Sequence, residues 1–179
     1  MKGIVFTEFL EMVDQAYGLE MSDTLIDECN LPSGGAYTAV GTYDHAEIVQ
    51  LVRKLSEKTA TTVPDLLKTF GKYLFGTFKK GYPAFLEAAN NAFDFLESIE
   101  KYIHVEVRKL YPDAELPTFE THRPDGNTLE MKYKSERRMA PFAEGLIEES
   151  LNYFEEEATI KTENLNPDGS LVKFTITKI

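Results

Sequence analysis

Positive charge is scarce in this chain of 179 residues, in which 19 Lys and Arg stand against 30 Asp and Glu. The formal net charge is -11 at pH 7. Nucleic acids and anionic membrane surfaces attract clusters of cationic side chains, and no run of Lys or Arg supplies one. We therefore expect neither as a partner. No apolar run has the length of a membrane span, and carboxylates interrupt the N-terminal stretch "MKGIVFTEFLEMVD", unlike a signal peptide. We expect a cytoplasmic protein.

Cysteine and histidine are also rare. Cys29 is the only cysteine, which excludes an internal disulfide and a cysteine-based zinc cluster. The three histidines, His45, His104 and His122, show no metal-ligand spacing to one another. No Ser or Cys nucleophile motif marks a catalytic partner for His104. Nothing in these residues indicates an enzyme.

Tryptophan is absent, but 12 Phe and 9 Tyr predict an aromatic core or an aromatic-lined cavity. Apolar residues recur at helical spacing through the first two thirds of the chain. The expected helices cover about 3–17, 22–30, 44–59, 64–78 and 93–111, with a short one after Gly81 and a stop at Pro112.

The pattern changes after residue 112. Alternating apolar residues predict a strand at 127–135, and a helix is expected to begin near Pro141. The segment 158–179 predicts two strands joined by a turn at 167–169. The residues alone thus indicate a helical N-terminal part joined to a smaller antiparallel sheet with a helix across it.

His104 lies within the helix expected at 93–111. At about 3.6 residues per turn the apolar stripe of that helix passes to one side of His104. The stripe consists of Leu96, Ile99, Ile103, Val107 and Leu110. Two interpretations stay open: a solvated histidine on a mixed face, or the single protein ligand of a heme iron, since the porphyrin supplies the other nitrogens.

A heme site also needs donors for two propionates, and "YKSERR" offers them. Tyr133 and Ser135 carry hydroxyls that a strand would place on one face, and Arg137 has a planar fork suited to a carboxylate. Alone, the pattern Y-x-S-x-R is short, so polar residues at a strand end remain the alternative.

Joined to His104, this motif resembles the heme nitric oxide/oxygen binding (H-NOX) domains, which include the heme domain of soluble guanylate cyclase. The resemblance runs along the chain through "MKGIVF", "FGKYLF", "IHVEVRKLYPDAELP", "YKSER" and "FAEGLIEESLNYF". It implies a single domain over residues 1–179 of the α+β class. An N-terminal helical subdomain would pack on a C-terminal subdomain with a four-stranded antiparallel sheet and flanking helices, with heme b between them.

The resemblance also implies the role of each site residue. His104 matches the axial ligand of the heme iron, and Pro117 matches a proline that presses on the porphyrin. Tyr133, Ser135 and Arg137 match the propionate-binding triad. The distal-pocket positions are Val5, Phe9, Leu74, Phe78 and Phe142. Oxygen-binding members are similar in carrying a tyrosine where this chain has Phe142, so we expect no distal hydrogen-bond donor unless Tyr73 supplies one.

The function implied is a stand-alone heme gas sensor, not an enzyme, that binds nitric oxide and carbon monoxide in preference to oxygen. The chain ends at Ile179 with no kinase or cyclase segment, so we expect it to regulate a histidine kinase or a cyclic-di-GMP enzyme in trans. Two alternatives stay open. One is an oxygen-reactive heme protein such as a nitric oxide dioxygenase, and the other is a heme-free helical interaction module.

Overall fold

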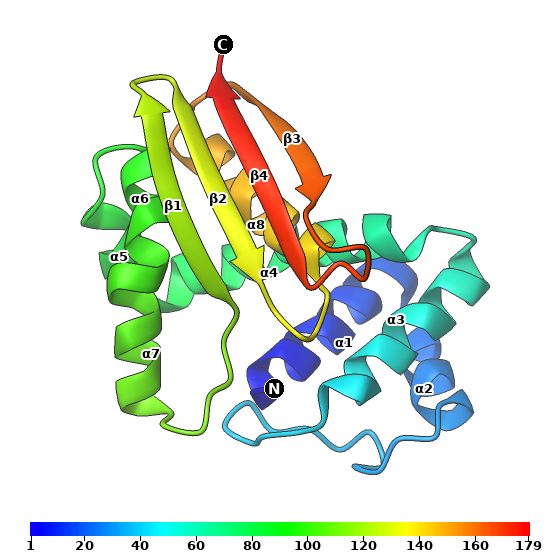
Figure 1. Ribbon diagram of the computed structural model, residues 1–179. Coiled ribbons are helices and arrows are strands. Elements are labelled where there is room, and N and C mark those ends of the chain that lie inside the picture. The colour runs from blue at the N-terminus through cyan, green and yellow to red at the C-terminus, as the bar shows by residue number, and fades with distance from the viewer.

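The computed structural model describes residues 1–179, which fold into two parts (Figure 1). Each part has its own hydrophobic core. The N-terminal part contains α1 (Gly3–Tyr17), α2 (Leu19–Glu28), α3 (His45–Thr59) and most of α4 (Val63–Gly81). The C-terminal part contains α5 (Pro83–Glu87), the helical run that carries His104, a sheet and α8 (Ala140–Tyr153). The predicted α+β class is confirmed. No helix combines the length and the apolar character that crossing a membrane requires.

The sheet is antiparallel and four-stranded, in the order β1-β2-β4-β3. Its strands are β1 (Thr118–Asp125), β2 (Thr128–Lys134), β3 (Ala158–Asn164) and β4 (Leu171–Lys178). Alternate residues of β2 face inward and pair with inward residues of β4, as Met131 does with Phe174 and Tyr133 with Val172. Helix α8 packs against this buried face (Figure 1). This packing fixes where β2 ends and α8 begins.

Strand β1 was not predicted by its residue pattern and was expected only through the four-stranded sheet that the family resemblance implied. The pattern is weak because β1 lies at the edge of the sheet, where few of its side chains are buried. It also contains Pro124, which an edge strand tolerates because its outer backbone groups need no partner strand. His122 lies within β1.

The helix predicted at 93–111 is continuous but irregular at its centre. It consists of α6 (Ala92–Ser98), a π-helical turn η1 (Ile99–Ile103) and α7 (His104–Leu110). The His104 N–H donates to the carbonyl of Ile99, which is the wider π-helical spacing. The turn accommodates an extra residue, so everything after it is rotated by about 100° relative to a regular α-helix.

This rotation reverses the expected exposure of two side chains. Leu110, predicted to lie on the apolar stripe, is 66% exposed, whereas His104 is only 9% exposed. The interpretation of His104 as a solvated residue, favoured by regular periodicity, is therefore wrong. Regular periodicity fails here because the π-helical turn changes the phase of the helix just before His104.

Two glycines allow α4 and α8 to cross at short range. A Cβ atom on Gly71 would collide with the carbonyl oxygen of Phe142, and one on Gly145 would collide with the carbonyl oxygen of Lys68. Beside this crossing, Lys68 Nζ pairs with Glu148 Oε1 at 2.8 Å. The crossing joins the helix that supports the N-terminal core to the helix that covers the sheet.

We expect Gly145→Ala to lower the free energy of unfolding by about 1–3 kcal/mol, because the added methyl group must push the two helices apart. Gly76→Ala is the matched control, since a Cβ at Gly76 in α4 meets no atom within 4 Å. The control should be neutral or stabilise the protein by up to about 1 kcal/mol, because alanine favours the helix. Urea denaturation followed by circular dichroism measures both, and equal effects would contradict the close crossing.

Candidate functional site

His104 is held as a neutral imidazole with one nitrogen free. Its Nδ1 lies 2.9 Å from Glu100 Oε2. Burial lowers the pKa of His104, although the hydrogen bond and the charge of Glu100 act in the opposite direction. Because a carboxylate only accepts, it places the single N–H of the neutral ring on Nδ1. Nε2 keeps its lone pair and makes no hydrogen bond within the protein, so it is available as a metal ligand.

Glu100 is itself fixed as a carboxylate. Burial acts to raise its pKa, but hydrogen bonds from His104 and from the Phe119 N–H outweigh it, so the pKa of Glu100 is lowered. The Phe119 N–H lies 3.2 Å from Glu100 Oε2. The ring of Phe119 neighbours both His104 and Tyr133. Its centroid lies 5.9 Å from that of the His104 ring and 5.8 Å from that of the Tyr133 ring. Strand β1 therefore connects His104 to the predicted propionate-binding residues.

Tyr133, Ser135 and Arg137 lie together where β2 ends. The Tyr133 hydroxyl oxygen accepts the Met139 N–H at 3.1 Å, and Ser135 Oγ accepts the Arg137 N–H at 3.2 Å. Burial raises the pKa of Tyr133, so its phenol stays protonated and remains a donor. These backbone contacts shape the turn that leads into α8.

Arg137 gives the strongest indication of a carboxylate-binding site in this group. Its side chain is only 13% exposed, and its sole ion pair is with Glu115, whose side chain is 83% exposed, at 3.2 Å between Nη2 and Oε2. A guanidinium so well buried faces a carboxylate that solvent surrounds almost completely. Such an exposed pair contributes little, so a propionate that offers two oxygens can replace Glu115. The residues present fit a carboxylate-bearing group.

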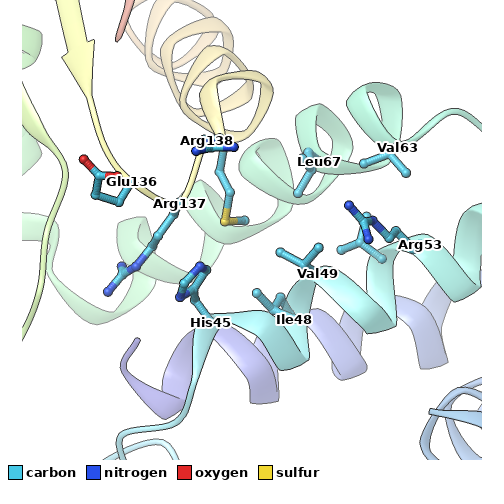
Figure 2. Close-up of a pocket in the computed structure, with 11 residues that line it drawn as sticks. His45, Ile48, Val49, Arg53, Val63, Leu67, Glu136, Arg137 and Arg138 are labelled. Atoms are coloured by element: carbon cyan, nitrogen blue, oxygen red, sulfur yellow. The ribbon is translucent and has the colours of Figure 1, made fainter. Parts of the chain in front are cut away.

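Arg138, next in the chain, is different. Its side chain is 54% exposed and pairs with Asp168 on the β3–β4 turn. Figure 2 shows that Arg137 and Arg138 leave the turn in different directions. A groove of about 470 Å³ between α3, the start of α4 and this turn is lined by both arginines (Figure 2). Arg137 is the only predicted site residue in its lining, so this groove is not the predicted heme site.

The predicted distal residues gather in the N-terminal core. Phe9 and Leu74 are fully buried, and Val5, Phe78 and Phe142 pack against the same cluster. Sequence reasoning missed Phe70, whose ring lies 5.3 Å from that of Phe9 and 5.1 Å from that of Phe142. Its spacing of one helical turn before Leu74 was the available signal.

No side-chain donor from this distal group is found. The Tyr73 hydroxyl, the suspected alternative donor, lies 3.0 Å from Gln15 Nε2 in an exposed setting. Pro117 is half-buried directly before β1, two residues from the backbone N–H that Glu100 accepts. No group of three His, Cys, Asp or Glu side chains is placed to hold a metal ion. The chemistry offered is one imidazole nitrogen, an apolar aromatic face, and hydroxyl and guanidinium donors for carboxylates.

Comparisons with known proteins agree with this donor set. The profile of the family described as "Haem-NO-binding" matches residues 2–162. The unliganded Fe(II) H-NOX protein from K. algicida is 45% identical, with a TM-score of 0.96, over 100% of this chain and 97% of that chain. An H-NOX protein from Shewanella woodyi, solved with IWP-051 in the Fe(II)CO state, is 43% identical, with a TM-score of 0.85, over 100% and 95%.

An H-NOX protein from S. oneidensis in the Fe(II)NO state is 24% identical, with a TM-score of 0.92, over 100% of this chain and 99% of that chain, which shows the shared fold. No curated protein matches the sequence.

We expect Arg137→Ala to speed heme loss by at least about tenfold, since a hydrogen bond to a charged group contributes about 1.5–3 kcal/mol. Arg138→Ala removes the same side chain one residue later and should leave the rate near that of the unmodified protein. Transfer of heme to excess apomyoglobin measures both rates. Indistinguishable rates for the two variants would remove Arg137 from the propionate site.

Proposed function

Because this chain belongs to the Haem-NO-binding (H-NOX) family, we propose that it is a heme-based gas sensor that prefers nitric oxide and carbon monoxide to oxygen. The cofactor of the family is heme. We take residues 1–179 as one sensor domain that holds heme b and regulates a separate signalling protein rather than catalysing a reaction. The observation that carries the proposal is a buried neutral His104 combined with a distal cluster that lacks a hydrogen-bond donor.

Bound heme supplies the iron on which a diatomic gas binds. His104 Nε2 would be the protein's ligand to that iron, because Glu100 already occupies Nδ1. Arg137, Tyr133 and Ser135 would hold a propionate, and Pro117 would contact the porphyrin. The phenylalanines and leucine of the distal cluster exclude water from the gas-binding side.

Selectivity follows from the charge that each gas develops when it binds. Bound oxygen draws negative charge to its outer atom and needs a hydrogen-bond donor in a dry pocket, whereas nitric oxide and carbon monoxide depend on a donor less. Phe142, Phe9 and Leu74 cannot donate, and the Tyr73 hydroxyl lies with Gln15 on an exposed surface. The Fe(II)CO state of the 43% identical S. woodyi protein supports carbon monoxide as a ligand.

The reduced protein should form nitric oxide and carbon monoxide complexes but no stable oxygen complex in air, as visible absorption spectra will show. Phe142→Tyr should slow oxygen loss if its hydroxyl reaches the gas, by a stabilisation of about 1 kcal/mol. Phe142→Leu is the matched control without a donor. A stable oxygen spectrum from the unmodified protein would contradict the selectivity and would favour an oxygen-reactive protein such as a nitric oxide dioxygenase.

Signalling depends on the two tethers that heme provides. Through His104 it connects to the helical run from Ala92 to Leu110, and through Arg137 it connects to the turn before α8. Binding of a strong ligand such as nitric oxide would weaken the bond between His104 and the iron, which would release the first tether. The shift that follows regulates a partner only if the partner binds the two states with different free energy.

The exposed side of the His104 helix is our proposed contact surface for that partner, a histidine kinase or a cyclic-di-GMP enzyme in trans. Tyr102, Val105 and Leu110 are exposed there, on the same helical run as buried His104. Movement of His104 therefore changes this surface directly, whereas the distal cluster lies inside the N-terminal core.

His104→Gly should lose heme, and free imidazole should restore heme without restoring the tether. The rescued variant should affect a cognate partner as the nitric oxide complex of the unmodified protein does. His122→Gly, which removes a histidine from β1, should keep heme without imidazole. If His104→Gly retains the normal spectrum unaided, His104 is not the ligand. If the rescued variant acts like the unliganded protein, the tether mechanism fails.

A further inference from the structure

The Glu100 carboxylate accepts hydrogen bonds from three groups, two of them on α7 and one on β1. Oε2 accepts from His104 Nδ1 at 2.9 Å and from the Phe119 N–H at 3.2 Å. Oε1 accepts from Arg108 Nη2 at 3.3 Å. Both carboxylate oxygens are therefore used, and the contacts come from the same helical run and from β1. Glu100 cannot turn away from His104 without also losing the bond to the strand.

The π-helical turn brings these groups together. Glu100 lies within η1, and His104 follows directly after it. The turn buries the imidazole while keeping its Nδ1 within hydrogen-bonding distance of a carboxylate from the same helix. Single π-helical turns interrupt α-helices rarely, and those that occur lie frequently at functional sites. The strand contact then fixes the carboxylate beside the ring.

We propose that Glu100 is a positioning residue that sets the strength of the bond between His104 and the heme iron, and so sets how readily nitric oxide breaks that bond. This inference rests on the proposed sensor function. A carboxylate that accepts the Nδ1–H of a ligating histidine fixes the ring orientation and makes the other nitrogen a stronger electron donor. A stronger donor resists the weakening that nitric oxide causes on the opposite face.

Arg108 opposes the effect of Glu100 on His104. Its guanidinium binds the second oxygen of Glu100 and withdraws negative charge from the carboxylate. Because Arg108 is 42% exposed, its effect on that charge is moderate. Removing Arg108 should leave more charge on the oxygen that faces His104 and so strengthen the bond to iron. Removing the charge of Glu100 should therefore weaken the bond between His104 and iron, and removing Arg108 should strengthen it. If Glu100 only held the helix to β1, these opposite effects would not be expected.

The test compares Glu100→Gln, Arg108→Met and the control Glu106→Gln, each in the heme-bound protein. Glutamine keeps an acceptor of the same shape at lower charge, and methionine keeps an apolar stem without the guanidinium. Glu106 is a carboxylate on the same helix that pairs with Lys109 instead. Resonance Raman spectra of the reduced, unliganded protein report the iron–histidine stretching frequency, and stopped-flow spectra report how fast the five-coordinate nitrosyl form appears.

We expect Glu100→Gln to lower the stretching frequency and to speed formation of the five-coordinate form by about tenfold. Loss of a hydrogen-bond partner of a metal ligand typically has an effect of about ten- to a hundredfold, and we take the lower value. Arg108→Met should raise the frequency and slow the conversion, and Glu106→Gln should change neither. An unchanged frequency in Glu100→Gln, or shifts of the same sign in the two variants, would overturn the proposal while leaving the sensor function intact.

Should Glu100→Gln fail to fold, Arg108→Met carries the test alone: a raised frequency supports the proposal and an unchanged one overturns it. Failure of the unmodified protein to bind heme or nitric oxide would instead overturn the proposed function.

Discussion

The phase change at η1 is the constraint on which the site depends. A regular α-helix from Ala92 to Leu110 would bury Leu110 and leave His104 toward solvent, where a metal–imidazole bond competes with water. The π-helical turn reverses this arrangement and buries His104 beside a strand. Glu100 and the Phe119 N–H then hold the ring at the end of that turn. Helix irregularity, histidine burial and strand contact form one structural unit.

A second constraint joins the two cores. The glycines of α4 and α8 bring their backbones into contact, so the helix beneath the distal cluster is packed directly on the helix that covers the sheet. Phe142 belongs to α8 but packs against the N-terminal cluster. Arg137 lies two residues before α8's cap, in the turn that starts it. Met139, two residues after Arg137, also packs against the N-terminal cluster, so the turn that carries Arg137 lies beside the junction of the two parts.

The charge distribution suits a group with carboxylates although the protein is strongly acidic. Most cationic side chains near the site already pair with carboxylates of the protein, as Arg108 does with Glu100. Arg137 also pairs with a carboxylate, but it differs from the others because this partner, Glu115, is almost fully exposed. A buried guanidinium gains more from a bidentate partner in a dry site than from a mobile surface carboxylate. We therefore expect Arg137 to contribute most of the local preference for a propionate.

The sequence by itself determined the fold class, the family and heme as the cofactor, all of which the structure and the comparisons confirm. Short-range patterns sufficed for the N-terminal helices and for β2, because burial repeats there with regular period. The roles of the individual site residues stay predictions, although the structure gathers Tyr133, Ser135 and Arg137 in one place.

Only the tertiary structure decided three features: the edge strand β1, the burial of His104, and Phe70 in the distal cluster. Each depends on contacts between segments far apart in the chain or on a π-helical turn. Helical spacing placed Phe70 on the same face as Leu74, but its contacts with Phe9 and Phe142 come from the tertiary structure. Glu100 shows the limit most clearly. Its spacing to His104 is visible in the sequence, but its bond to the backbone of β1 exists only because the strand packs beside the helix.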